Sequence, residues 1–296
     1  MGQQNHWQQA YFELSGLVKY SYLTNHKLES INHDKPVLVC LHGWLDNAAS
    51  FIPVSAYLND YQIILIELAG HGFSEHRPAD SHYHLIDWVY DLWRIFETLP
   101  CERFNLIGHS MGGMLASILA SLLPHKIDTL VLLESSAAFT TSANDLLDNM
   151  QAAFNSRAQL EKNNLTASPK RRNLAALPSL IQARANTSEI SPELASLLIE
   201  RNIKLTEQGF IWRSDPRLKT LSPIRLDESQ ALAYIQNIKA DCLAILGDVG
   251  YTSINDSLTQ RAHSFRNLHI NSVMGGHHCH MQSPKQTADL IRLFIR

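Results

Sequence analysis

The chain has 296 residues, of which 45% are hydrophobic and 18% are charged, and its formal net charge is -3 at neutral pH. This balance is typical of a globular protein and lies far from the disordered and membrane-embedded classes. No long run carries one sign of charge, so we expect neither nucleic acid nor an anionic membrane surface as a partner. The length suits one α/β domain that carries an insertion.

The N-terminal stretch and the cysteines indicate in which cellular compartment the protein is expected. The first ten residues, MGQQNHWQQA, are polar and lack the apolar core of a secretory signal. The four cysteines show no C-x-x-C spacing and predict neither a disulfide framework nor a thiolate zinc site: Cys40, Cys101, Cys242 and Cys279. We therefore expect a protein of the reducing cytoplasm.

The first half of the chain alternates between predicted strands and predicted helices. Apolar and polar side chains alternate over residues 11–23, which predicts an antiparallel hairpin. The runs PVLVCLHG (36–43) and QIILIEL (62–68) are continuously apolar, as in strands buried on both faces of a parallel sheet. Helices are expected over 48–58 and 88–99. This βαβ rhythm predicts a mostly parallel sheet.

The second half of the chain interrupts that rhythm. Another apolar strand is predicted at 129–133, and leucine- and alanine-rich helical segments broken by prolines then replace the strands. Strands return at 242–246 and 267–273, with a helix near 254–263 and a last helix from Pro284. The predicted organisation is one core formed by residues 1–139 and 236–296, with a helical cap insertion at 140–235.

The stretch FNLIGHSMGGM (104–114) predicts a strand, a sharp turn and a helix. Gly108, Ser110 and Gly112 satisfy the pattern G-x-S-x-G, in which a serine on a strained turn exposes its hydroxyl. Small residues two positions before and after the serine prevent clashes between strand and helix. A phosphate-binding loop is the alternative, but the turn has no lysine and does not match G-x-G-x-x-G. We expect Ser110 to be a nucleophile.

A serine nucleophile needs a base, which the C-terminal GGHHCHMQSP can supply. His277 follows two glycines directly after the last predicted strand, at the sheet edge where the serine lies. The cluster H-H-x-H could instead bind zinc, but it fits neither H-E-x-x-H nor a zinc finger, and no carboxylate lies beside it. We expect no metal. His280 is expected to turn inward as a hydrogen-bonded residue, and His278 to lie towards the cap or solvent.

Acyl transfer also requires two backbone amides that stabilise the oxyanion. The residue after the nucleophile, Met111, supplies one N–H group. HGW (42–44) follows the first central strand, and we assign the second N–H to Trp44. The alternative for this segment is a plain turn with a packing tryptophan.

Taken together, these segments resemble the α/β-hydrolase superfamily over essentially the whole chain. LHGWLDNAASF, ELAGHGFSEHRP, LIGHSMGG and GGHHCHMQSP look most like the serine hydrolase-like proteins, near the carboxylesterase and haloalkane dehalogenase branch. The resemblance implies an α/β-hydrolase fold with a nucleophile at Ser110, a base at His277 and oxyanion amides at Trp44 and Met111. It implies no cofactor.

The acid of the triad departs from the commoner pattern of the superfamily. That pattern is G-x-x-D after the seventh strand, and Gly250 occupies the expected acid position here, with Asp248 two positions early. Glu134 ends the preceding strand in LVLLESS, at the same edge as the serine, and members of the branch that the chain resembles carry their acid there. We expect Glu134 to be the acid, with Asp248 as the alternative.

The predicted function is a serine carboxylesterase that cleaves small or medium acyl esters, or thioesters, through an acyl-enzyme. Its partner is a small-molecule ester. A serine at this turn argues against the epoxide hydrolases and dehalogenases of the superfamily, which use a carboxylate. Three alternatives stay open: a C–C bond hydrolase on the same triad, a hydrolase-like protein that binds a ligand without turnover, and a metal-dependent hydrolase built on the C-terminal histidines.

Overall fold

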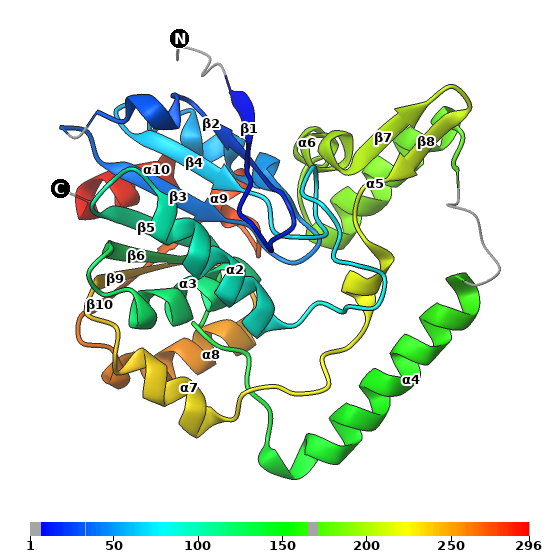
Figure 1. Ribbon diagram of the computed structural model, residues 1–296. Helices are drawn as coiled ribbons and strands as arrows, with labels where there is room; N and C mark the ends of the chain where they lie inside the picture. Colours follow the sequence, from blue (N-terminus) through cyan, green and yellow to red (C-terminus); the bar gives the residue numbers. More distant parts are fainter. Residues whose placement is uncertain (1–6, 33, 165–170, 296) are drawn as a thin grey trace.

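The computed structural model describes residues 7–32, 34–164 and 171–295. Within them an eight-stranded sheet has the order β1-β2-β4-β3-β5-β6-β9-β10 (Figure 1). β2 pairs antiparallel with β1 and β4, and the other neighbours are parallel. This is the predicted parallel sheet with its N-terminal antiparallel hairpin. The strands are β1 (Gln8–Phe12), β2 (Tyr20–Thr24), β3 (Val37–Leu41), β4 (Gln62–Ile66), β5 (Phe104–His109), β6 (Ile127–Leu133), β9 (Asp241–Gly247) and β10 (Leu268–Val273).

Helices cover both faces of this sheet, which explains why the central strands are apolar at every position. In β3, Val37, Val39 and Leu41 join the hydrophobic cluster on one face, and Leu38 and Cys40 join the cluster on the other. Successive side chains of a strand point to opposite faces, so both must be apolar. The first face packs on α2 (Leu85–Thr98), α3 (Met111–Leu122), α7 (Glu228–Ile235) and α8 (Thr252–Arg261), and the second on α1 (Ile52–Ser55), α9 (Cys279–Gln282) and α10 (Pro284–Phe294).

The region 140–235 lies between β6 and β9 in sequence and holds both helices and a hairpin. Figure 1 shows α4, α5, α6 and the hairpin β7–β8 beside the sheet core, on the side away from the chain ends. Their bounds are α4 (Leu146–Asn164), α5 (Leu177–Ser188), α6 (Pro192–Asn202), β7 (Ile203–Thr206) and β8 (Gly209–Trp212). α5 and α6 share a small apolar cluster with Met281 of α9. The last helix of the region, α7, instead packs against α3, and its Ile235 belongs to the main core.

Two differences from the expected elements are local. The helix expected over 48–58 is a 3-10 turn (Ala48–Phe51) followed by the single turn of α1. Asn47 caps this turn by accepting a hydrogen bond from the backbone N–H of Ala49. The hairpin β7–β8 lies in the insertion, of which residues 209–219 were expected to be extended and the rest mainly helical.

No helix in the described part of the chain is long and apolar enough to cross a membrane. Residues 1–6, which belong to the polar N-terminal stretch discussed above, lie outside the described residues.

Candidate active site

Ser110 lies on the turn between β5 and α3 with a backbone φ of 52° and ψ of -117°. A positive φ is unfavourable for a residue with a side chain, so the surrounding contacts must hold it in place. A Cβ added at Gly112 would lie 2.0 Å from the carbonyl oxygen of Leu41, and one at Gly108 would lie 2.4 Å from that of Gly112. The two glycines therefore let β3, β5 and α3 approach closely enough to build the strained turn.

The structure brings Ser110, His277 and Glu134 into one hydrogen-bonded chain. His277 Nε2 lies 2.9 Å from Ser110 Oγ, and its Nδ1 lies 3.2 Å from Glu134 Oε2. A carboxylate only accepts hydrogen bonds, so the Nδ1–H donates to Glu134, and Nε2 is left to accept from the serine hydroxyl. These three side chains come from the turn after β5, the loop after β10 and the end of β6.

The Glu134 carboxylate is fixed by backbone donors. It is 1% exposed, and it accepts hydrogen bonds from Gly247 N at 2.7 Å and Tyr251 N at 3.4 Å. A Cβ added at Gly250 would lie 2.2 Å from Glu134 Oε1, so the glycine at this position leaves the space that the carboxylate fills. Asp248 is exposed and accepts from Gly275 N at 2.8 Å. The structure thus brings Glu134, and not Asp248, to the histidine.

The environment of His277 favours the neutral ring that a base requires. Burial lowers the pKa of His277, and the hydrogen bond to Glu134 opposes part of that shift. The ring of Tyr251 stacks on that of His277, with 4.5 Å between the centroids. No pattern in the sequence marks Tyr251, because only the fold brings this residue of the β9–α8 loop beside the C-terminal histidine.

The two expected oxyanion amides lie at the same edge of the sheet. Met111 is the first residue of α3, so its N–H has no partner within the helix. Neither this N–H nor that of Trp44 has a hydrogen-bond acceptor among the residues that the structure describes. The indole N–H of Trp44 donates to the carbonyl of Leu218 at 2.9 Å, which ties the turn after β3 to the region 140–235.

The remaining C-terminal histidines are buried, contrary to part of the expectation. His278 does not lie at the solvent: it is 5% exposed, and its Nε2 lies 3.2 Å from Asp46 Oδ2. His280 turns inward as expected, but within the described chain neither of its ring nitrogens has a hydrogen-bond partner. Asp46 was interpreted from the sequence as a structural residue of a loop; it is buried and also binds Arg184 of α5. The neighbourhood of Asp46 and His278 was missed because three distant segments create it.

Exposed apolar side chains follow the carboxyl ends of the strands around Ser110. Four of them are about half exposed or more: Trp44, Phe139, Val249 and Tyr251. They follow β3, β6 and β9, whose carboxyl ends meet at one edge of a parallel sheet. The sheet edge that carries Ser110 therefore also carries exposed apolar side chains.

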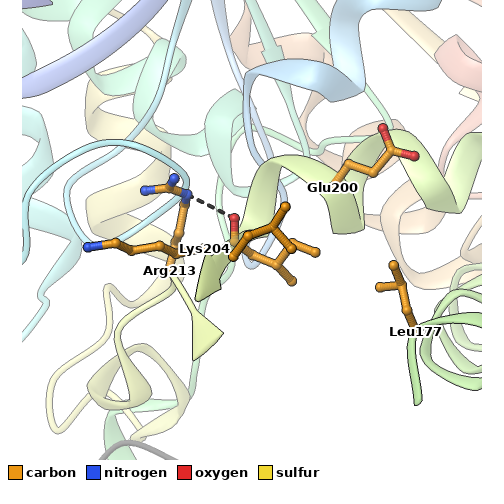
Figure 2. A pocket seen from close by; sticks show the side chains of 6 residues that line it. Leu177, Glu200, Lys204 and Arg213 are labelled. Atoms are coloured by element: carbon orange, nitrogen blue, oxygen red, sulfur yellow. Dashed lines mark hydrogen bonds between the residues drawn. The ribbon is translucent and has the colours of Figure 1, made fainter. Parts of the chain in front are cut away.

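The region 140–235 also holds a cavity of about 590 Å³, whose lining side chains are drawn in Figure 2. Its lining residues come from the start of α5, the end of α6 and the hairpin β7–β8: Leu177, Glu200, Ile203, Lys204, Leu205 and Arg213. Arg213 Nε donates to the carbonyl of Ile203 at 3.0 Å. No residue of the Ser110 site lines this cavity.

Comparisons with known proteins agree with this fold. The family model for the alpha/beta hydrolase fold matches residues 36–193. A serine hydrolase-like protein of Danio rerio is 29% identical over 272 residues, which cover 90% of this chain and 82% of that protein. The crystal structure of the hypothetical protein PA1622 from Pseudomonas aeruginosa PAO1 matches with a TM-score of 0.83 at 28% identity, covering 97% of this chain and 99% of that one. A pimeloyl-[acyl-carrier protein] methyl ester esterase of Shewanella woodyi is 37% identical over 112 residues, 38% of this chain and 40% of that protein.

Proposed function

Since the chain belongs to the alpha/beta hydrolase fold family, we propose that it is a serine hydrolase that cleaves carboxylic esters or thioesters with Ser110, His277 and Glu134. The observation that carries the proposal is the unbroken hydrogen-bond chain from Ser110 Oγ through His277 to Glu134. In the same proposal residues 140–235 form a cap insertion in a core of residues 1–139 and 236–296.

Each residue has a defined role in the proposed reaction. His277 Nε2 takes the proton from Ser110 as Oγ attacks the acyl carbonyl carbon, and the N–H groups of Trp44 and Met111 stabilise the oxyanion. His277 then gives that proton to the departing alcohol or thiol, which leaves an acyl-enzyme. A water molecule that transfers its proton to His277 attacks the ester carbon, and the acid is released as Ser110 regains its proton.

Glu134 keeps the base in the required tautomer. Its carboxylate accepts the Nδ1–H of His277 and stabilises the imidazolium that forms during attack. The backbone donors at Gly247 and Tyr251 hold the carboxylate in place, so the histidine ring keeps its orientation towards the serine.

The surface around the serine supports an acyl group with an apolar chain. Phe139, Val249 and Tyr251 are exposed at the sheet edge and carry no charge. At about 25 cal/mol per Å² of buried apolar area, each methylene of a bound acyl chain stabilises the complex by about 0.8 kcal/mol. The name of the Shewanella woodyi relative, a methyl ester esterase, agrees with ester chemistry.

The test is hydrolysis of p-nitrophenyl esters of graded acyl length by the purified protein and by Ser110→Ala. We expect kcat/KM of the variant to fall about 10⁴-fold or more, because the residual rate rests on the oxyanion amides and binding alone. Ser121→Ala is the matched control, since Ser121 lies on the helix that follows Ser110 and its hydroxyl donates to the carbonyl of Ile118 at 2.7 Å. Equal rates for Ser110→Ala and the unmodified protein would contradict the proposal.

A further inference from the structure

Asp46, His109 and His278 form a buried cluster next to the proposed base. One potential ligand atom from each residue lies within 4.8 Å of the other two, and all three side chains are buried. The ring centroid of His277 is 4.9 Å from that of His109 and 5.6 Å from that of His278. The proposed hydrolysis uses none of these three side chains.

The hydrogen bonds of His109 leave one ring nitrogen without a partner. Its Nε2 lies 2.8 Å from the carbonyl oxygen of His277, and a carbonyl only accepts, so Nε2 carries the hydrogen. The neutral ring then has a lone pair on Nδ1. This nitrogen is buried and lacks a hydrogen-bond partner among the described residues, yet it lies 3.5 Å from Asp46 Oδ2. A buried lone pair that faces a carboxylate is unfavourable unless a proton or a cation lies between them.

The two distances from the Asp46 oxygen suit a divalent metal ion in that space, and the two histidine nitrogens lie within 4.8 Å of each other. Asp46 Oδ2 lies 3.5 Å from His109 Nδ1 and 3.2 Å from His278 Nε2. Around a tetrahedral Zn²⁺ with bonds of about 2.0–2.2 Å, neighbouring ligand atoms are about 3.4 Å apart. Two imidazole nitrogens with one carboxylate oxygen form a donor set that Zn²⁺ binds in proteins.

Two of the three residues already make the contacts that usually support a metal site, whereas His278 Nδ1 has no hydrogen-bond partner among the described residues. A histidine ligand commonly donates its other N–H to a backbone carbonyl, as His109 does to His277. The second oxygen of Asp46 is held by Arg184. Gly43 supplies the room, because a Cβ there would lie 2.8 Å from His109 Nδ1 and 3.3 Å from Asp46 Oδ2.

We propose that Asp46, His109 and His278 bind one Zn²⁺ or similar divalent transition-metal ion. The ion links the turn after β3, the end of β5 and the loop after β10, which carries His277. It is a structural ion in this proposal, because its ligands are buried and the serine remains the nucleophile.

The first test is equilibrium dialysis of the metal-stripped protein against Zn²⁺. We expect one tightly bound ion per chain, and at least 10-fold weaker binding by Asp46→Asn and by His278→Gln. His125→Gln is the control, since His125 is exposed and lies outside the cluster. Equal binding by the two cluster variants and the unmodified protein would assign the ion to surface histidines and overturn the proposal.

The second test avoids any variant that fails to fold. Crystals of the unmodified protein grown with Zn²⁺ are expected to give an anomalous difference peak between Asp46, His109 and His278. An ordered water molecule at that position without anomalous signal, or a peak elsewhere only, would overturn the proposal. Both tests measure metal binding and not hydrolysis, so their results are independent of the proposed serine hydrolase activity.

Discussion

At Glu134 a single side chain decides how the proposed base is oriented. Glu134→Gln keeps the shape but replaces the oxygen that accepts from His277 Nδ1, so the wrong tautomer is favoured and we expect kcat to fall about 10³–10⁴-fold. Asp248→Asn is expected to change kcat by less than about 3-fold, because Asp248 accepts from the backbone of Gly275 and not from the histidine. Steady-state kinetics of both variants on one ester make the comparison. A large loss for Asp248→Asn with little loss for Glu134→Gln would reassign the acid.

Gly250 allows a second prediction about the same carboxylate. Gly250→Ala places a Cβ 2.2 Å from Glu134 Oε1, so the carboxylate must move away from His277. We expect activity to fall nearly as far as in Glu134→Gln, with little further loss when both changes are combined, since each removes the same interaction. The measurement is kcat for the two single variants and the double variant. Losses that multiply would show that the two residues act independently.

At the scale of elements, α6 is attached to the core by a buried ion pair. Arg201 Nε and Nη2 donate to the two carboxylate oxygens of Glu67 at 2.6 and 3.0 Å, and Glu67 is fully buried. Arg201→Met leaves the Glu67 carboxylate without its cation. We therefore expect the free energy of unfolding, measured in urea, to fall by about 3–5 kcal/mol. Lys285→Met is the control: its pair with Asp289 is exposed, and we expect a loss of about 0.5 kcal/mol or less. Equal losses of stability in Arg201→Met and Lys285→Met would mean that the buried pair of Arg201 and Glu67 does not stabilise the contact of α6 with the core.

The elements that the sequence predicted are those whose signal is local. The strands β3, β4 and β5 are continuous apolar runs, and the turn at Ser110 has glycines at a fixed spacing. These elements could therefore be predicted from the local order of residues alone. The pairing of β7 with β8 was not predicted, because IKLT and GFIW are short and lie among leucine- and alanine-rich helical segments. The cluster of Asp46 with His278 depends on segments more than 200 residues apart, and no pattern along the chain marks such a pairing.

For the molecule as a whole, buried neutral histidines make stability depend on pH. Burial lowers the pKa of His42, of His280 far more, and of His71 to about 3. His71 is held neutral by its contacts, because its Nε2 accepts from Leu45 N at 3.2 Å. Below about pH 6.5 the unfolded chain binds protons at these rings and the folded chain does not, so the free energy of unfolding falls as the pH falls.

Part of the slope of the free energy of unfolding against pH can be assigned to one residue, His71. A histidine that protonates only when unfolded contributes about 1.4 kcal/mol per pH unit below about pH 6.5 and nothing above it. We expect His71→Gln, whose side-chain oxygen can still accept from Leu45 N, to flatten the slope between about pH 6 and 5 by about that amount. Urea unfolding of both proteins across that range measures the difference, with His125→Gln as the exposed control. Parallel slopes for His71→Gln and the unmodified protein would mean that His71 also binds its proton in the folded state, despite its burial.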